Sequence, residues 1–571
     1  MASTVKRKLS VKEVVQQICE DSESDISSDD IEYSDTESET DVGVQSSVVP
    51  TASNVGFNWL DYPYIDPWEP SWLPDFQPSR GVLVNTLNFE PVDYFKLFFP
   101  ETVFDLMSAE TNRYADSFLA SSGNLSPYSR FREWKPTTVE EIKGFVALQI
   151  EMGLDWRYNF REHWSTRYLS PGGFGQVMPR NRYILLQSFL HFCDNAQQRH
   201  KGEDGYNPLF KVQRLIDLTI PTYRQVYQPG RDLSVDESMV KFKGRLCFRQ
   251  YMPDKPTKYG IKDFVLAESS TGFCLNVMTY TGKYSFPRQD QPLSTQVVLD
   301  LLRGYENQGH VVYMDNFYSS PDLFQELQQK GIGACGTVRS NRKNMPPDFR
   351  PDKLRLKRGD DPLFMRSDDL VAIAWHDVKR VTCLTTVHTN NTCEKTIRQK
   401  GNPDGRLLEK PVALEEYNNK MSGVDRLDQM LATHGYSHKC MKWYQPLYHR
   451  IREIALSNGY VLYKQDKGSV NRLDAAAFRK KVVDGLLSEY VAVDVSRRPG
   501  RPSGSPAPVR LTDRHFPGSY SDKKYHPDCV VCSNRQTKQR HQCKTFCKQC
   551  NLPMHAVVCF ERYHSLLHYQ L

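Results

Sequence analysis

The sequence contains no apolar run long enough to cross a bilayer. Its longest apolar stretches, such as residues 144–150, fall far short of the roughly 20 residues that a membrane-spanning helix requires. The N-terminus also lacks the apolar core of a signal peptide. At 571 residues, of which 39% are hydrophobic, the chain is too long for one core and leaves room for unfolded segments. We therefore expect a soluble, intracellular protein with about three or four folded units.

Basic residues are absent from residues 13–79, a stretch that carries 16 acidic residues. Such a segment cannot bury enough apolar surface to offset the entropy of ordering, so residues 1–79 are predicted to form a disordered acidic tail. Four of the 74 basic residues and 16 of the 68 acidic residues precede Arg80, so the rest of the chain carries 70 basic and 52 acidic residues, a net charge of about +18. This excess suits a polyanionic partner, because Lys and Arg neutralise phosphates and release counterions. Charge alone does not distinguish DNA from RNA.

Cysteine is scarce over most of the chain and concentrated at its C-terminal end. Eight of the 14 cysteines are scattered between Cys19 and Cys440, and six lie within residues 529–559. In an intracellular protein, such crowding favours metal ligands over disulfides.

The C-terminal cysteines and histidines form four pairs of soft metal ligands in residues 526–571. The eight candidate ligands are Cys529, Cys532, Cys547, Cys550, His555, Cys559, His564 and His568. Because tetrahedral zinc takes four ligands, we predict two structural Zn²⁺ ions in a cross-brace, with the first and third pairs on one ion and the second and fourth pairs on the other. His568 fits the eighth position by spacing, and His541 and Cys543 are the alternatives.

The hydrophobic period changes along the chain. Apolar residues at three- and four-residue intervals within 180–190 predict a helix, and residues 80–228 as a whole are predicted to form a mainly helical domain. Predicted strands and helices then follow in the order strand 233–236, strands within 246–252 and 264–280, strand 311–314, helix 321–329 and strand 334–338. This order predicts an α/β ribonuclease-H-like core, a mixed sheet with helices. The predicted divisions are the core in 229–340 and 411–470, an insertion domain in 341–410 and a linker in 471–525.

Four aspartates occupy positions that suit phosphodiester chemistry. Asp236 lies in the middle of the first strand, and Asp315 ends the apolar run 311–314 at a carboxyl edge, where sheet folds usually build sites. Asp425 and Asp428 are three residues apart, on one face of a predicted helix. Two-metal cleavage requires acids that converge on two Mg²⁺ ions about 4 Å apart. A single aspartate is more often a surface charge or a helix cap, so spacing alone leaves both interpretations open.

Several motifs resemble, in the same order, those of piggyBac-type transposases. The motifs are residues 110–115 (ETNRYA), 180–183 (RNRY), 233–238 (LSVDES), 242–245 (FKGR), 258–262 (KYGIK), 313–318 (YMDNFY) and 423–429 (GVDRLDQ). The resemblance implies that Asp236, Asp315 and Asp425 are the catalytic Mg²⁺ ligands, with Asp428 as a fourth carboxylate nearby. It also implies an insertion domain between the second and third acids. Trp443 matches a family Trp that supports distorted DNA, although it could equally belong to the core.

The resemblance further implies a function on double-stranded DNA. A family member cuts at terminal inverted repeats, passes through DNA hairpins and inserts at TTAA, with no small-molecule substrate. We expect a nuclear protein that acts as a homodimer or higher oligomer, with residues 80–228 as a DNA-binding and dimerisation domain. The resemblance implies that the zinc module binds the terminal repeats, and protein or histone contacts are the alternative for this module. Two alternatives stay open: a domesticated DNA-binding or chromatin protein that has lost mobility, and a nuclease that cuts without joining.

Overall fold

The structure is a computed structural model that describes residues 56–570, except for 63–67, 77, 124, 127, 254, 256, 283–290, 377, 400–401, 437, 469–472, 495–513, 521–525, 535–538 and 567. The chain divides into two compact units, Met1–Ala492 and Val493–Leu571. Residues 1–55 of the predicted acidic tail lie outside the described residues. Within the described part, no helix combines the length and the apolar character that crossing a membrane would require.

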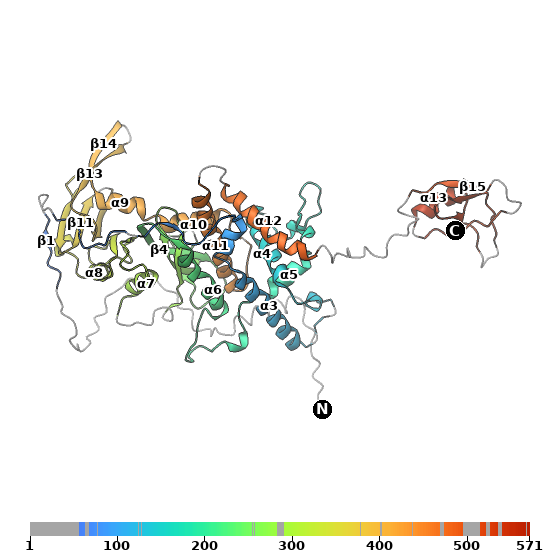
Figure 1. Cartoon of the computed structure of the whole chain (residues 1–571), viewed down its shortest axis with the longest axis horizontal. Helices are drawn as coiled ribbons and strands as arrows, with labels where there is room; N and C mark the ends of the chain where they lie inside the picture. The colour runs from blue at the N-terminus through green and yellow to red at the C-terminus, as the bar shows by residue number, and fades with distance from the viewer. Residues whose placement is uncertain are drawn as a thin grey trace, which may run out of the picture. The chain divides into compact units, whose positions relative to one another are not determined.

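The first unit contains a mixed sheet of ten strands, which extends from β4 to β11 and β1 at one end of the unit (Figure 1). The strand order is β1-β10-β11-β12-β9-β8-β4-β6-β5, and β7 also pairs with β6. β8 runs parallel to both of its neighbours, β4 and β9, whereas the other pairs are antiparallel. The bounds of the strands are β1 Leu60–Asp61, β4 Asp232–Lys241, β5 Gln250–Tyr251, β6 Tyr259–Glu268, β7 Cys274–Thr279, β8 Val311–Met314, β9 Gly333–Thr337, β10 Leu363–Ser367, β11 Leu370–His376 and β12 Arg380–Thr385.

Five of these strands account for the predicted catalytic core. They lie in the order β7-β6-β4-β8-β9. β7, β6 and β4 are antiparallel to one another in turn, whereas β8 and β9 run parallel to β4. This arrangement fits a ribonuclease-H-like core, so the predicted mixed sheet with helices is confirmed. β8 is buried at all four positions, as expected of an inner parallel strand with an uninterrupted apolar sequence. Of the predicted strand region 246–252, only Gln250–Tyr251 pairs.

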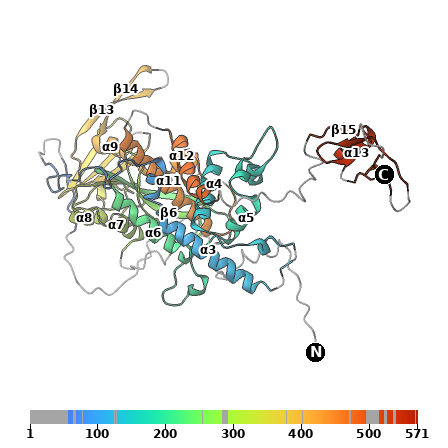
Figure 2. The same cartoon turned by 45° about the vertical axis from the view of Figure 1, so that its right-hand side comes forward.

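Helices occupy most of residues 80–228 and also cover the sheet (Figures 1 and 2). α11 packs against α2, α6, α10 and β4, so one long helix connects the N-terminal helices to the sheet. The ring of Phe98, which follows α2, lies 5.6 Å from the ring of Phe273 beside β7. The helical region and the sheet therefore share one hydrophobic core. The bounds of the α-helices of this unit are α2 Pro91–Lys96, α3 Glu101–Ser121, α4 Val139–Leu154, α5 Arg180–Phe189, α6 Phe210–Val226, α7 Leu293–Leu301, α8 Pro321–Gln329, α9 Val412–Lys420, α10 Gly423–Thr433, α11 Tyr444–Lys467 and α12 Ala475–Asp494.

Residues 341–410, predicted as an insertion domain, extend the core sheet instead of building a sheet core of their own. β12 pairs with β9, and β11 and β10 continue the sheet outward. A separate hairpin of β13 (Thr392–Gln399) and β14 (Asn402–Pro411) projects away from this end (Figures 1 and 2). β1 then pairs with β10, and Trp72 Nε1 donates to Thr386 O at 3.0 Å. The folded part therefore begins before the boundary predicted at residue 79.

The predicted linker over residues 471–525 is wrong for its first part, because Ala475–Asp494 form α12. The buried side chains of this helix recur at three- and four-residue spacing, a signal that is readable in the sequence: Phe478, Val482, Val483 and Leu486. Arg479 Nη1 lies 2.6 Å from Glu453 Oε2 on α11, and Arg452 Nη2 lies 2.8 Å from Glu453 Oε1. All three side chains are buried, so a charged network fastens α12 to α11.

We expect Arg479→Ala to lower the free energy of unfolding by about 2 kcal/mol, because the buried Glu453 carboxylate loses one of its two cationic partners. Urea unfolding of the whole chain, followed by tryptophan fluorescence, measures the change. Lys481→Ala is the matched control on the same helix, since the Lys481 side chain is 59% exposed. It should change the free energy by less than about 0.5 kcal/mol. Equal effects of the two substitutions would show that the network does not hold α12.

Candidate functional site

The parallel pairing of β4 and β8 places two predicted acids side by side. In the register of this pair, Val235 lies opposite Met314, so Asp236 and Asp315 are the next residues at the same end. Asp236, Glu237 and Asp315 each offer a carboxylate oxygen, and these oxygens all lie within 4.8 Å of one another. The structure therefore brings Asp236 and Asp315 together, although 78 residues separate them in the sequence.

Backbone hydrogen bonds orient the two aspartates. The amide of Phe317 donates to Asp315 Oδ1 at 2.9 Å, and the amide of Glu237 donates to Asp236 Oδ1 at 2.8 Å. Ser319 donates to the Asp315 carbonyl from both its amide and its hydroxyl, at 3.2 and 3.0 Å. The turn after β8 thus fixes the direction of the Asp315 side chain, because each bond closes within four residues.

Burial and crowding make this carboxylate group electrostatically unfavourable without a cation. Burial raises the pKa of Asp236 to about 8, with Lys255 opposing and Glu237 adding to the rise. Burial also raises the pKa of Asp315, and the Glu237 charge adds to it. The pKa of Glu237 is itself lowered, because the Lys262 ammonium and its other partners outweigh the effect of burial. Three oxygen donors of one sign in a buried site form a donor set that fits Mg²⁺.

Two lysines lie beside these carboxylates. Lys255 Nζ is 3.9 Å from Asp236 Oδ2 and donates to the Glu237 carbonyl at 3.2 Å. Lys262 Nζ is 3.4 Å from Glu237 Oε1, and it belongs to the 258–262 motif. Their positive charges offset part of the carboxylate charge.

Asp425 and Asp428 on α10 lie outside this three-carboxylate group. Asp425 is exposed in the first turn of the helix. Asp428 Oδ1 accepts hydrogen bonds from Ser238 Oγ at 2.6 Å and from Arg450 Nη2 at 3.0 Å, so its charge is already paired. The structure therefore does not gather the four predicted aspartates into one cluster, because α10 directs Asp428 toward α11.

Glu237 is a candidate ligand that sequence reasoning does not identify. It directly follows Asp236 in the 233–238 motif, and that adjacency was the available signal. Alternation along a strand places neighbouring side chains on opposite faces, which argues against using both. In the structure, however, Asp315 at the end of β8 lies close to the carboxylates of both Asp236 and Glu237, so both can belong to one site.

Trp443, the Trp for which DNA support and core packing were both open, belongs to the core. Its side chain is 8% exposed, and its ring packs edge-on against Phe248 at 5.5 Å.

In the second unit, the first and third ligand pairs lie together as the cross-brace predicts. Cys529, Cys532, His555 and Cys559 place their ligand atoms within 4.8 Å of one another. His555 Nδ1 is 3.5 Å from the sulfurs of both Cys532 and Cys559. Burial raises the pKa of the Cys529 thiol, but backbone amides, including that of Cys532, bring it down to about 7. Three thiol sulfurs and one imidazole nitrogen form a donor set that fits Zn²⁺.

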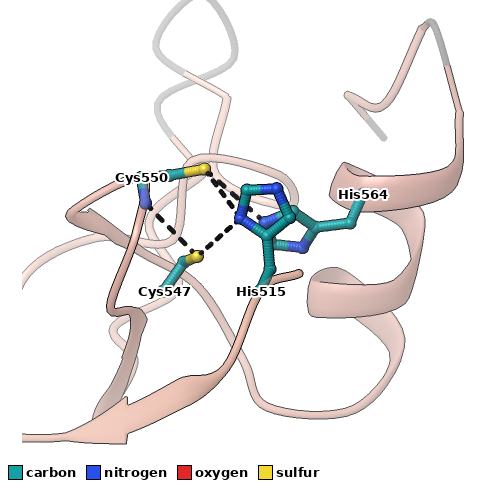
Figure 3. A group of neighbouring side chains, drawn as sticks. All are labelled: His515, Cys547, Cys550 and His564. Carbon is teal, nitrogen blue, oxygen red and sulfur yellow. Dashed lines mark hydrogen bonds between the residues drawn. The ribbon is translucent and has the colours of Figure 1, made fainter. Parts of the chain in front are cut away.

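The second group contains His515 where the sequence predicts His568 (Figure 3). His515 Nδ1 lies 3.4 Å from Cys547 Sγ and 3.5 Å from Cys550 Sγ. Cys550 Sγ is also 3.7 Å from His564 Nε2, while His564 Nδ1 faces the Phe560 carbonyl at 2.7 Å. That carbonyl selects the tautomer with the proton on Nδ1, in which Nε2 has the lone pair that a metal ligand needs.

Strand pairing explains why His515 is the fourth member. β15 (Pro517–Ser519) is antiparallel to β16 (Thr545–Cys547), with Pro517 opposite Cys547, so His515 lies close to that cysteine. A third strand, β17 (Leu552–Pro553), pairs with β16, and α13 (Val558–Ser565) carries His564. His568 is exposed and lies outside the group, which corrects the prediction.

The two alternatives for the eighth ligand also lie outside both groups. Cys543 Sγ is engaged with the carbonyls of Pro527 and Thr545, at 3.6 and 3.5 Å. His541 is exposed and belongs to neither ligand group. His515 was missed because it stands alone in the predicted linker, with no ligand spacing to mark it.

Comparison with known proteins identifies the class to which this fold and carboxylate group belong. A family model described as Transposase IS4 matches residues 90–460, which is more than half of the chain. The chain belongs to this transposase family, in the piggyBac group.

Relatives and a solved structure agree with this assignment. Human PiggyBac transposable element-derived protein 2 is 25% identical over 81% of this chain and 74% of its own length. Human PiggyBac transposable element-derived protein 5 is 23% identical over 69% of this chain and 75% of its own length. The fold is similar to that in a cryo-EM structure of a piggyBac transposase synaptic complex with hairpin DNA, with a TM-score of 0.63 and 24% identity over 84% of this chain and 98% of that one.

We expect His515→Ala to lower the zinc content of the purified chain from two ions to one, because the second group then retains only three ligands. Elemental analysis of the full chain after gel filtration measures the ratio. His568→Ala, which removes an exposed imidazole from the same unit, should retain both ions. Zinc loss in His568→Ala with none in His515→Ala would contradict the grouping.

Proposed function

We propose that this chain is a cut-and-paste DNA transposase that nicks DNA at terminal inverted repeats, forms hairpin ends and inserts at TTAA. The observation that carries the proposal is the carboxylate group at the sheet edge, where Asp236 and Asp315 offer oxygens within 4.8 Å of each other. Membership of the piggyBac transposase family supports the same conclusion, because phosphodiester cleavage by divalent ions requires convergent acids.

Asp236, Asp315 and Asp425 would hold two Mg²⁺ ions, with Glu237 beside the first two. When bound, the ions supply an activated attacking oxygen and stabilise the leaving oxygen. The protein's contribution is to fix the carboxylates in place through the β4–β8 register and the turn after Asp315. Asp428 takes the position of a neighbouring carboxylate whose charge is paired with Arg450.

The position of α10 supports a role for Asp425. Gly423, two residues before it, lies so close to β4 that a Cβ atom there would be 2.2 Å from Ser234 Oγ. Ser234 is two residues from Asp236 on the same strand. The first turn of α10 thus belongs to the neighbourhood of the sheet carboxylates, from which Asp425 can contribute an oxygen once DNA and metal are bound.

Double-stranded DNA is the proposed substrate, in the form of terminal repeats and a TTAA target. The net charge of about +18 after residue 79 supports a polyanionic partner. Residues 80–228 would bind DNA and dimerise, and the second unit, with two structural Zn²⁺ ions, would bind the terminal repeats. Joining two element ends requires both in one complex, so the active species is at least a dimer. We place this activity in the nucleus, where chromosomal DNA is available, and assign no small-molecule substrate.

We expect Asp236→Ala and Asp315→Ala each to reduce Mg²⁺-dependent nicking by at least about 10³-fold, because each removes a metal ligand. The assay uses full chain, Mg²⁺ and a donor plasmid that carries the terminal repeats flanking the gene, with a TTAA target plasmid. Asp348→Ala is the matched control, since that side chain is 69% exposed. It should retain activity within about twofold.

The same assay separates the alternatives. A domesticated protein would bind the repeats without nicking them, and a nuclease would nick without producing joined molecules. Equal nicking by the parent chain and both aspartate variants would contradict the assigned site.

A further inference from the structure

Asp428 belongs to a polar network that joins α10, α11 and β4. Arg450 on α11 donates from Nη2 to both Ser238 Oγ and Asp428 Oδ1, at 2.5 and 3.0 Å. Ser238 Oγ completes the triangle by donating to Asp428 Oδ1 at 2.6 Å. The Arg450 side chain is 11% exposed and that of Asp428 36%, so the pair is shielded from water mainly on the arginine side.

A second carboxylate lies beside Ser238 of this network. Asp263 on β6 lies directly opposite Ser238 in the β4–β6 register, and it is 1% exposed. Thr279 Oγ1 on β7 donates to Asp263 Oδ1 at 2.8 Å. Burial raises the pKa of Asp263 to about 6; the Arg450 charge opposes this rise, and the Asp428 charge adds to it. The charge of one guanidinium therefore acts on two acids from different elements, and its loss would leave both carboxylates with less compensation.

In addition to apolar packing, two contacts join α10 to the strand that carries Asp236. The first is the close approach of Gly423 to Ser234, where a Cβ would lie 2.2 Å from the hydroxyl. The second is the bond between Asp428 and Ser238. Ser234, Asp236 and Ser238 occupy alternate positions of β4, so Asp236 lies between the two attachment points. On the helix, Asp425 likewise lies between Gly423 and Asp428.

We infer that Arg450 is a positioning residue: through Asp428 and Ser238 it fixes α10 along β4 and so holds Asp425 in reach of Asp236 and Asp315. This inference rests on the proposed function, because it assigns the fourth carboxylate of the site to orientation of the helix. Asp428 then fixes the position of α10, because its charge is paired with Arg450. Asp425, in the first turn of the helix, can still bind a metal ion.

Hydrogen exchange tests the positioning without requiring any activity. In the full chain without metal, Arg450→Gln should speed exchange of the α10 amides at least tenfold, because one attachment of the helix is lost. Amides of β8 should keep their protection. Ser238→Ala, a smaller change, should act in the same direction, and Arg450→Lys should restore part of the protection. Lys467→Gln, which removes one exposed charge from the same helix α11, is the control.

Metal dependence supplies the second measurement. Arg450→Gln should raise the Mg²⁺ concentration for half-maximal nicking about tenfold while leaving DNA affinity in Ca²⁺ unchanged, because a displaced Asp425 weakens the metal site. Asp428→Asn should match it, and the double variant should be no worse than either single variant, as expected of two residues that act as one unit.

Two outcomes would overturn the inference. One is unchanged α10 exchange and unchanged Mg²⁺ dependence in Arg450→Gln. The other is loss of nicking by Asp428→Asn at every Mg²⁺ concentration while Arg450→Gln resembles the parent, which would make Asp428 a metal ligand. If the parent chain itself does not nick DNA, the proposed function fails, and the exchange measurement still decides whether Arg450 positions α10.

Discussion

The parallel pairing of β4 with β8 is the constraint on which the rest of the site depends. Both acids extend a strand register that is fixed by Val235 opposite Met314, and β8 is held on its other side by β9. Because side chains alternate along a strand, a slip of one residue would turn Asp236 to the other face. The packing of β8 opposes such a slip, because it would exchange the side chains of two different cores, Val312 and Met314 on one face and Val311 and Tyr313 on the other. Core packing and placement of the carboxylates are therefore the same requirement.

Helix α11 organises charges that the sheet alone could not accommodate. Arg450 serves Asp428 and Ser238 on the side of the proposed site, whereas Arg452 pairs with Glu453, which in turn binds Arg479 of α12. Buried charges of this kind stabilise little by themselves, because desolvation cancels much of the attraction. Their effect is on geometry, because each planar guanidinium donates its hydrogen bonds only in fixed directions. One helix thus sets the positions of both α10 and α12.

Local features were predictable from the sequence, and features that depend on distant partners were not. The predicted helix 321–329 is α8, because Ser320 caps it and Pro321 opens it, and both signals are local. Asp236 and Asp315 were identifiable because Asp236 lies within a predictable strand and Asp315 directly follows the end of another. The pairing of Asp428 with Arg450 depends on how two helices cross, which no spacing encodes. The apolar period of α12 predicts a helix, but the Pro-, Gly- and Ser-rich segment that follows it led to the prediction of a linker for both.

The second unit shows the same limit at its two candidate metal-ligand groups. Ligand spacing located seven of the eight members, because paired Cys and His residues come from turns and helix turns. His515 joins through the β15–β16 pairing, over 30 residues before Cys547 in the chain. The core of this unit consists largely of the ligand cysteines with Val531, Met554 and Tyr563. Such a small core cannot offset the entropy of ordering by itself, so we expect folding of this unit to be coupled to the binding of the proposed metal ions. A metal held by His515 would therefore also tie β15 to the rest of the unit, because this histidine lies two residues before that strand.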